Sequence, residues 1–339
     1  MSKLNALIAG STGYIGVQLI KLLINHKYVK IRYLCGNSSV GKKISFYDRS
    51  IKKKLPKIIK FNKKYLKNVD IVFTALPNGE AQEISKSLLK NNTLIDLAAD
   101  FRLNKSSEYL KWYKQKHRAP NNIKKSIYAL PEIIGKKVKN FSIIGCPGCY
   151  PTSILLPLLP LLKNKMINTK NIIIDSKSGY SGAGRGVHKK FKNKNLYESL
   201  SAYGVGFHRH NSEIDQELTN YTNSKISFTF TPHLIPMFRG ILSTTYVDLK
   251  SGFSIKKAQK ILKKFYKKDK FIKVLNNDSL VSTNDVINSN YCYISICKTK
   301  YKNRIIILSA IDNLIKGGAG QAIQNMNLKF DFNISEGLK

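Results

Sequence analysis

The chain has 339 residues, and its 58 Lys and Arg against 20 Asp and Glu give a formal net charge of +38 at pH 7. Hydrophobic residues make up 42% of it and aromatic residues 10%, which excludes a disordered polycation and suggests about two folded domains. Only 8 of the 58 basic residues are Arg. Because nucleic-acid surfaces depend strongly on Arg, we interpret the charge as a bias toward Lys that suits a small anionic substrate, and we expect no nucleic-acid partner. A basic nucleic-acid-binding protein remains the alternative from a different class.

The apolar runs do not predict a targeting or membrane segment. The run after Met1 reaches a glycine at Gly10, and the apolar stretch 154–162 contains Pro157 and Pro160, so both are too short for a signal peptide or a membrane span. The five cysteines, an odd number, do not suggest a disulfide framework. We therefore expect a cytoplasmic protein with reduced thiols and no membrane partner.

The first 145 residues alternate between strand-like and helix-like patterns. A helix is predicted over 14–26, and apolar runs predict strands at 5–9, 29–35, 70–76 and 93–97. Strands separated by helices are typical of βαβ units. Residues 1–145 are therefore expected to form an α/β Rossmann domain with a parallel sheet.

The pattern changes after residue 145. Strand candidates lie at 171–175, 225–231, 240–249 and 291–298, and helix candidates lie at 255–268 and 319–328. Long strands that follow one another predict an α+β domain over 146–310 with an antiparallel or mixed sheet. A C-terminal helix within 311–339 is expected to pack back on the first domain. The segment 250–290 is polar, and its overall organisation is not predicted.

A glycine-rich segment follows the first strand and opens the first helix. The spacing G-x-x-G-x-x-G covers Gly10, Ser11, Thr12, Gly13, Tyr14, Ile15 and Gly16. Glycine lets the backbone approach a pyrophosphate closely, and the helix N-terminus offers N–H groups with a partial positive charge. We predict a dinucleotide site here, with a tight turn that binds no ligand as the alternative.

The end of the second strand indicates which dinucleotide binds. An NAD site commonly has Asp or Glu there to hold the ribose 2′-OH. This chain instead has Ser38, Ser39 and Lys42, and no acidic residue from Cys35 to Lys43. Hydroxyls and lysines suit a 2′-phosphate, so NADP(H) is the predicted cofactor.

Cys149 lies where a strand ends, the chain turns through Pro147-Gly148, and a helix is expected to begin. A helix N-terminus stabilises a thiolate and lowers the pKa of a cysteine, which covalent catalysis requires. Three other interpretations stay open. They are an inert buried cysteine, a redox pair of Cys146 and Cys149, and a zinc site formed with His208 and His210.

Two histidines flank an arginine at His208-Arg209-His210. They precede a predicted amphipathic helix with Asn211 or Ser212 as its N-cap. One histidine in this position could act as general base for the thiol, and the arginine could hold an anion. A histidine with a purely structural role is the alternative.

Two further glycine-rich loops are candidates for ligand contact. Residues 177–185 follow a predicted strand, and residues 316–321 open the last helix, which carries Asn325 one turn along. Both loops allow close backbone approach, and the second could bring the end of the chain to the cofactor.

Taken together, these segments resemble the N-acetyl-gamma-glutamyl-phosphate reductases, the NADPH-dependent enzymes of arginine biosynthesis. The similarity extends over nearly the whole chain and is most specific at 147–152 and 208–210. It also includes the segments 10–16, 75–79, 96–103, 128–132, 178–185, 208–214, 232–234 and 320–328. Aspartate-semialdehyde dehydrogenases share 10–16 and 178–185 in looser form. Pro157, where the family usually has a small residue, is expected to disturb the helix behind Cys149.

The resemblance implies a fold, a mechanism and a set of site residues. The fold is a Rossmann domain followed by a glyceraldehyde-3-phosphate-dehydrogenase-like domain for catalysis and oligomerisation, in a homo-oligomer that is a dimer or tetramer. Cys149 would form a thioester with an acyl phosphate, and His210 would be the acid and base. Further cofactor contacts are implied for Leu76, Pro77, Ser178, Gly179, Ser181, Gly182 and Asn325. Substrate contacts are implied for Arg102, Arg185, His208 and Arg209. No metal is implied, and a reductase of aspartyl or N-acetylaminoadipyl phosphate is the alternative within the class.

Overall fold

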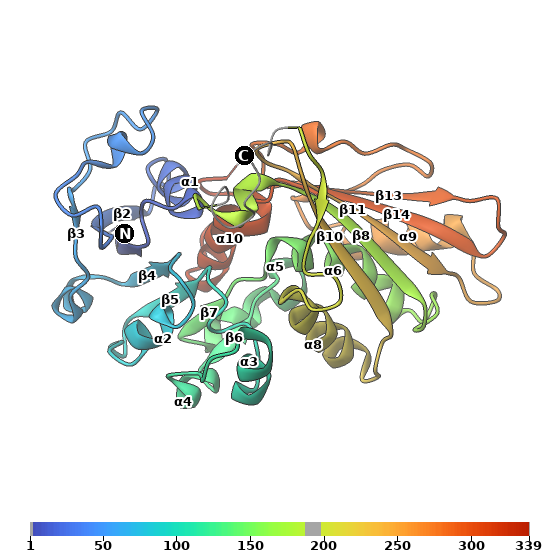
Figure 1. The fold of residues 1–339 in the computed structure, drawn as a ribbon, viewed down its shortest axis with the longest axis horizontal. Coiled ribbons are helices and arrows are strands. Elements are labelled where there is room, and N and C mark those ends of the chain that lie inside the picture. The colour runs from blue at the N-terminus through green and yellow to red at the C-terminus, as the bar shows by residue number, and fades with distance from the viewer. Residues whose placement is uncertain (1–2, 187–197, 339) are drawn as a thin grey trace. The chain divides into compact units, whose positions relative to one another are not determined.

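The computed structural model describes residues 3–186 and 198–338. The chain forms two compact units, drawn in Figure 1. The first unit comprises residues 1–147 and 318–339, and the second unit comprises residues 148–317. The first is α/β and the second is α+β, which confirms the predicted fold class. Within the described ranges, no helix has both the length and the apolar character needed to cross a bilayer.

Within the described residues, the first unit is built on a seven-stranded sheet with the order β3-β2-β1-β4-β5-β7-β6. All of its neighbouring strands are parallel. The strands are β1 (Leu4–Ala9), β2 (Val29–Cys35), β3 (Ile58–Ile59), β4 (Ile71–Thr74), β5 (Thr93–Asp96), β6 (Ser126–Tyr128) and β7 (Ile143–Gly145). Strands β4, β5 and β7 are buried along their whole length, as expected where helices cover both faces of a parallel sheet.

Helices α1 (Tyr14–Leu23) and α10 (Gly320–Lys329) pack against each other in the core of the first unit. Helix α1 ends at Leu23, earlier than the predicted residue 26, because His26 turns inward. The ring of His26 lies with Nε2 2.9 Å from Oδ1 of Asn327 on α10. The C-terminal helix is thus part of the first unit. The other helices of this unit are α2 (Glu80–Ser85), α3 (Ser106–Tyr113), α4 (Pro120–Ile123), α5 (Pro131–Ile134), and the 3₁₀ turns η1 (Ile44–Phe46), η2 (Lys63–Asn68) and η3 (Gly135–Asn140).

As far as the structure describes the second unit, its sheet has the order β12-β13-β14-β11-β8-β10-β9 and mixes parallel and antiparallel pairs. The strands are β8 (Ile172–Gly179), β9 (Ser201–Ala202), β10 (Phe228–Ile235), β11 (Ile241–Asp248), β12 (Ile272–Val274), β13 (Cys292–Lys298) and β14 (Arg304–Ile311). Buried and half-buried residues alternate strictly along β11, so one face of the sheet is covered and the other is more open. Helices α6 (Cys149–Lys163), α8 (His210–Thr222) and α9 (Ile255–Phe265) form the covering layer (Figure 1).

Strands β8 and β10 of the second unit extend past their predicted ends. Strand β8 extends to Gly179, so Ser178 and Gly179 belong to the strand and not to a loop after it. Strand β10 likewise continues to Ile235. It contains Pro232, which has no backbone N–H to donate but still lies opposite Ser176 of β8 in the strand pairing. The polar segment 250–290 supplies α9, β12 and the 3₁₀ turn η5 (Thr283–Asp285).

Helix α6 is continuous from Cys149 to Lys163 and contains both Pro157 and Pro160. Pro157 therefore does not end the helix. Thirteen consecutive residues of α6, 150–162, are buried, and packing against α8 and β11 holds the helix together where backbone hydrogen bonds are lost.

The prediction that Asn211 or Ser212 caps helix α8 is wrong. The helix begins at His210, and its N-cap residue, Arg209, already has a helical conformation. The chain enters α8 from a turn in which the Asn211 N–H donates to the carbonyl oxygen of His208. Ser212 consequently lies inside the first turn, and its hydroxyl donates to the carbonyl oxygen of Arg209 at 2.6 Å.

Candidate functional site

The glycine turn of the first unit has a shape that only glycine allows. Gly10 has φ +85°, and a Cβ there would lie 2.2 Å from the carbonyl oxygen of Ala75. A Cβ on Gly16 would lie 2.2 Å from the carbonyl oxygen of Gly10. Gly13, the N-cap of α1, faces open space, since a Cβ there would meet only one atom, at 3.8 Å. The backbone around Gly13 can therefore approach a phosphate closely, which fits a dinucleotide.

The other residues of this segment divide between the core and the surface. Ser11 is buried, and its hydroxyl donates to the carbonyl oxygen of Cys35 at 3.0 Å, which fixes the turn to the end of β2. Thr12, Tyr14 and Ile15 are half-buried. Ile15 packs against the core of the first unit. Backbone atoms, more than side chains, are thus what the turn offers to a ligand.

Of the three residues after β2 that are predicted to hold a 2′-phosphate, two are exposed to solvent. Ser38 and Lys42 are exposed, and the Lys42 ammonium lies 4.9 Å from the centre of the Phe46 ring. Ser39 is buried, and its Oγ accepts a hydrogen bond from the hydroxyl of Tyr47 at 2.7 Å. Ser39 therefore shapes the segment from inside.

A small cavity of about 160 Å³ lies beside the glycine turn. It is lined by Gly10, by the end of β2 at 35–37, and by Leu76 after β4, together with Ala9, Phe61, Glu80, Glu83 and Ile84. Pro77 is exposed next to it. The cavity lies at the carboxyl ends of β1, β2 and β4, where ligands of parallel sheets bind.

Arg102 is buried within the first unit. Its Nε donates to the carbonyl oxygen of Cys146 at 2.8 Å, and one Nη donates to the carbonyl oxygen of Leu97 at 3.1 Å. These bonds tie the loop after β5 to the end of β7. The structure thus gives Arg102 a bracing role in addition to the predicted substrate contact.

Asn325 and Cys146 also lie in the buried part of the first unit. The Asn325 amide nitrogen donates to the carbonyl oxygen of Ala129 at 2.9 Å and lies 3.7 Å from the Cys146 sulfur. Its Oδ1 is buried and has no hydrogen-bond partner within the described residues, so a buried acceptor remains for a ligand. Burial raises the pKa of Cys146 to about 12, which opposes a redox role for this thiol.

Cys149 is the first residue of helix α6 in the second unit, as predicted, and is partly exposed. Two glycines make room around it. A Cβ on Gly317 would lie 2.6 Å from the Cβ of Cys149, and a Cβ on Gly148 would lie 2.4 Å from Nε2 of His210. The imidazole of His210, the first residue of α8, therefore packs directly on the backbone that leads into Cys149.

Glu213 completes this arrangement, and the sequence analysis did not identify it. The residue is fully buried. Its Oε2 accepts a hydrogen bond from the N–H of Gly148 at 2.8 Å, and its Oε1 lies 3.7 Å from Nε2 of His210. The spacing of three residues, which places His210 and Glu213 on one face of a helix, was the signal that could have revealed it.

Aromatic rings enclose the histidines. His208 and His210 lie with ring centres 4.7 Å apart, and the His210 backbone N–H donates to Nδ1 of His208 at 3.2 Å. The rings of Tyr150, Tyr203 and Phe230 lie within 5.3 to 5.7 Å of His208. Burial raises the pKa of Tyr150, so its phenol stays protonated and donates to the carbonyl oxygen of His233 at 3.1 Å. His208 is thus held within an apolar enclosure, whereas Arg209 is exposed.

The predicted residues Ser178, Gly179 and Ser181, at and after the end of β8, are tightly packed within the second unit. Ser178 is buried, and a Cβ on Gly179 would lie 2.7 Å from the backbone nitrogen of Arg239. The buried Ser181 hydroxyl accepts a hydrogen bond from Asn313 at 2.9 Å. Gly182 and Arg185 are exposed in and after the 3₁₀ turn η4 (Tyr180–Ala183).

The zinc interpretation gains no support from the geometry. Among residues 3–186 and 198–338, no group of three or more His, Cys, Asp and Glu is arranged to hold a metal ion. Cys149, His210 and Glu213 instead have the composition of a thiol with an acid–base histidine and a carboxylate behind it.

Two family models match the chain. One is described as "Semialdehyde dehydrogenase, NAD binding domain" and matches residues 5–141. The other is described as "Semialdehyde dehydrogenase, dimerisation domain" and matches residues 149–313. Aspartate semialdehyde dehydrogenase II of Vibrio cholerae, solved with the ligand ASA, has a TM-score of 0.72 at 16% identity, covering 98% of this chain and 99% of that one. The enzyme of Candida albicans, solved with NADP, also has a TM-score of 0.72, at 18% identity, over 98% and 100% of the two chains.

Curated relatives are similar in sequence over almost the full length. An N-acetyl-gamma-glutamyl-phosphate reductase of Clostridium botulinum is 43% identical over 332 residues, which cover 98% of this chain and 96% of that protein. One from Vesicomyosocius okutanii is 43% identical, covering 98% and 97%. A probable chloroplastic one from Oryza sativa is 41% identical, covering 98% and 80%. At this identity and coverage, the chain belongs to the N-acetyl-gamma-glutamyl-phosphate reductase family.

Proposed function

We propose that the protein reduces N-acetyl-L-glutamyl 5-phosphate to N-acetyl-L-glutamate 5-semialdehyde and phosphate, as a step of arginine biosynthesis. The observation that carries this proposal is the 41–43% identity to reductases of that name over nearly the whole chain. The arrangement of Gly148, Cys149, His210 and Glu213 in the second unit supports it, because acyl transfer needs a nucleophile with an adjacent base.

NADP(H) is the proposed cofactor. The turn from Gly10 to Gly16 would hold the pyrophosphate, and Ser38 and Lys42 would face the 2′-phosphate from the end of β2. Cofactor contacts are also proposed for Leu76, Pro77, Ser178, Gly179, Ser181, Gly182 and Asn325. When bound, NADPH supplies the hydride that converts a thioester into the aldehyde oxidation state.

Cys149 is the proposed nucleophile. Its sulfur bonds to the acyl carbon, the bond from that carbon to the phosphate oxygen breaks, and phosphate leaves with the electron pair. Backbone N–H groups in the first turn of α6 can stabilise the oxyanion of the tetrahedral intermediate, because helix α6 begins at Cys149. The product is an S-acyl cysteine.

His210 is the proposed acid and base. It takes the thiol proton of Cys149, and after reduction it protonates the developing alkoxide of the thiohemiacetal. Glu213 acts as a positioning residue, because its carboxylate lies 3.7 Å from Nε2 of His210 and accepts the N–H of Gly148. A fully buried carboxylate at this distance can fix the orientation of the imidazole ring.

The exposed guanidinium groups of Arg185 and Arg209 are the proposed contacts for the substrate's phosphate and carboxylate. His208 would shape the pocket from its aromatic enclosure. Arg102 is also a proposed substrate contact, and its guanidinium donates hydrogen bonds to two carbonyl oxygens of the first unit.

Self-association agrees with the match of residues 149–313 to a dimerisation domain. We place the subunit contact on the more open face of the second-unit sheet, where Ile173 is 42% exposed. A dimer or a tetramer is proposed, and light scattering of the purified protein measures which one forms. None of the five cysteines, all within the described residues, forms a disulfide, which suits a reducing compartment such as the cytoplasm.

The reverse reaction tests the function directly. Purified protein is expected to reduce NADP⁺ when N-acetyl-L-glutamate 5-semialdehyde and inorganic phosphate are both present. Arsenate in place of phosphate should also sustain the reaction, because it attacks the same thioester. If folded protein gives no phosphate-dependent rise in absorbance at 340 nm, which measures NADPH formation, the assignment is refuted. Aspartate semialdehyde and the aminoadipate analogue, tested in the same assay, measure the choice among acyl phosphates.

A further inference from the structure

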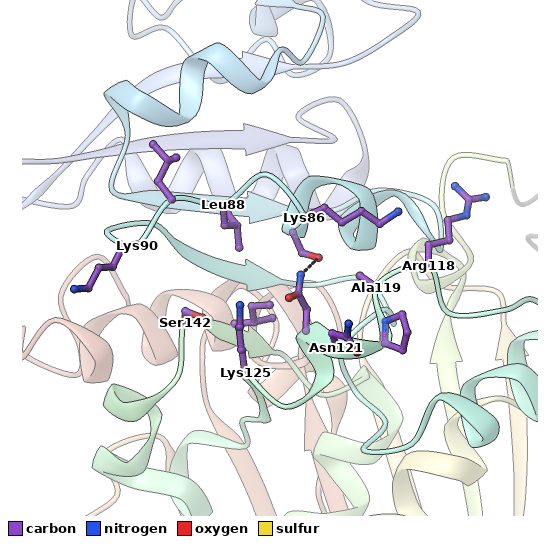
Figure 2. Close-up of a pocket in the computed structure, with 13 residues that line it drawn as sticks. Lys86, Leu88, Lys90, Arg118, Ala119, Asn121, Lys125 and Ser142 are labelled. Carbon is purple, nitrogen blue, oxygen red and sulfur yellow. Dashed lines mark hydrogen bonds between the residues drawn. The ribbon is translucent and has the colours of Figure 1, made fainter.

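A cavity of about 730 Å³ opens on the first unit, and none of its residues belongs to the site described above. It lies between the turn after α2 at 85–90, the segment 118–125 that contains α4, and the residues 142–143 at the start of β7 (Figure 2). Its volume is within the range of about 300–1,000 Å³ that is typical of small-molecule sites. All of its walls come from the first unit, so the cavity is defined by that unit alone.

The charged side chains of the cavity all have one sign. Lys86, Lys90, Arg118 and Lys125 contribute to the lining, and no Asp or Glu does. Lys86 pairs with Glu83 at 2.9 Å. In the part of the chain that the structure describes, no carboxylate forms an ion pair with Lys90, Arg118 or Lys125. Cations gathered around a concave surface without counter-charges produce a strong local field that attracts anions.

The walls between the cations are apolar. Leu88, Leu89, Pro120 and Ile143 line the cavity, and Leu89 is 42% exposed although it is a large aliphatic residue. A hydrogen bond of 2.9 Å from the Asn122 amide to the Ser85 hydroxyl joins the two sides of the cavity, and the dashed line in Figure 2 marks it. An apolar wall with a cationic rim is complementary to a molecule that has a flat or hydrocarbon body and several negative charges.

Arg118 is held in place by contacts with α2. Its backbone N–H donates to Oε1 of Gln82 at 2.6 Å, and a Cβ on Gly79 would lie 3.3 Å from the guanidinium carbon. The side chain thus packs against the first turn of α2 while its guanidinium remains available for an anion. Arg118 also offers a planar guanidinium with several donors, which suits a phosphate or carboxylate better than a lysine ammonium does.

We infer that this cavity binds an organic polyanion of nucleotide size, with its anionic groups on Lys90, Arg118 and Lys125 and its ring or hydrocarbon body against Leu88, Leu89 and Ile143. The inference is independent of the proposed function, because it concerns a separate set of residues. A single strand of nucleic acid shares part of this chemistry. The small ligand is favoured because one of only 8 arginines is present here and the cavity is lined by three separate segments of the first unit.

The experiment uses the full-length protein saturated with NADP⁺, so that a nucleotide probe does not enter the cofactor site. ATP and inorganic tripolyphosphate, both without Mg²⁺, are titrated by equilibrium dialysis, and ATP is expected to bind more tightly because its base contacts the apolar wall. The variant Lys90→Ala/Arg118→Ala/Lys125→Ala is expected to lose at least about tenfold in ATP affinity, equivalent to about 1.4 kcal/mol. Leu89→Ser is expected to weaken ATP but not tripolyphosphate.

The matched control carries the same loss of charge elsewhere. Lys57, Lys67 and Lys302 are exposed, and their triple alanine variant should change ATP affinity less than about twofold if the cavity, and not the overall charge, holds the ligand. Equal weakening in both triple variants overturns the inference, as does tripolyphosphate binding as tightly as ATP. Displacement of ATP by a single-stranded oligonucleotide at lower concentration assigns the surface to nucleic acid instead. If the triple variant unfolds, the single variant Arg118→Gln provides the same comparison with Lys67→Gln.

Discussion

The N–H of Gly148 donates a 2.8 Å hydrogen bond to the buried carboxylate of Glu213, which links the entrance of α6 to the first turn of α8. The two residues are 65 positions apart in the chain. The same carboxylate lies 3.7 Å from Nε2 of His210, so one side chain touches both the backbone before Cys149 and the proposed base. The entrance of α6, with the proposed nucleophile Cys149, and the start of α8, with the proposed base His210, are therefore linked through one buried side chain.

Glu213→Gln should separate positioning from packing. The amide oxygen can still accept the Gly148 N–H, but the negative charge beside His210 is lost. We expect kcat to fall by about tenfold to a hundredfold with KM little changed, because the imidazolium that forms when His210 takes the thiol proton loses its neighbouring negative charge. Glu213→Asp should restore part of the rate. A folded Glu213→Gln enzyme with an unchanged kcat would mean that Glu213 has a purely structural role.

Cys149→Ser and Cys146→Ser should have opposite consequences. We expect the first to reduce the reverse reaction by about a thousandfold or more, because a serine hydroxyl loses its proton far less readily than a cysteine thiol and is the weaker nucleophile. Cys146 is buried with a raised pKa, and its replacement should lower stability modestly and leave most of the activity. Steady-state rates together with thiol labelling by iodoacetamide measure both effects. A larger loss of rate in Cys146→Ser would shift the nucleophile to that residue.

Features that depend on neighbouring residues could be predicted from the sequence. The turn from Gly10 to Gly16 follows from glycine spacing, and the start of α6 at Cys149 follows from the Pro-Gly turn before it. Most strands with several apolar residues were predicted, although their ends differ by a few residues, but the apolar strand β14 (Arg304–Ile311) was not among them. The very short β3 and β6 were not predicted, because two or three residues show no alternation.

Features that depend on distant partners could not be predicted. Asp100 accepts hydrogen bonds from the N–H groups of Gly79 and Ala81 and so caps α2 from about 20 residues away, where a local cap would be expected. The hydrogen bond from the Gly148 N–H to Glu213 joins residues 65 positions apart and could not be predicted, although the spacing of His210 and Glu213 on one helix face is a local signal. The predicted N-cap of α8 was wrong because the residue before the helix, Arg209, already has a helical conformation and no side chain caps the helix.

Gly148→Ala should test the packing of His210 on the backbone. The added Cβ would lie 2.4 Å from Nε2 of His210, so the ring or the start of α6 has to move. We expect a loss of about a hundredfold in kcat/KM and a lower melting temperature, since misplacement by about 1 Å disturbs proton transfer. Gly186→Ala is the control, because a Cβ there meets no atom of the described residues within 4 Å. Equal activity of the two variants would show that His210 does not need its present position.

Acid should destabilise the first unit through two buried histidines. His26 Nε2 donates to Asn327 Oδ1 while its Nδ1 accepts the N–H of Tyr28, and His117 is held the same way between the Asp100 carbonyl oxygen and the Ala119 N–H. Both rings are neutral in this arrangement, and burial lowers the pKa of each below 6.5.

Because the folded state binds fewer protons than the unfolded chain at these two positions, their contribution to stability is present above pH 6.5 and is lost as the pH falls below it. Each histidine can contribute up to about 1.4 kcal/mol per pH unit in this window. Urea unfolding at pH 7.5 and pH 5.5 should therefore give a lower free energy of unfolding at pH 5.5. His26→Gln and His117→Gln should each reduce that difference, because glutamine can offer one donor and one acceptor without titrating. If the free energy of unfolding depends on pH identically in the wild type and in the double variant His26→Gln/His117→Gln, other groups cause the acid sensitivity. This follows because the slope of that free energy with pH is proportional to the number of protons taken up on unfolding.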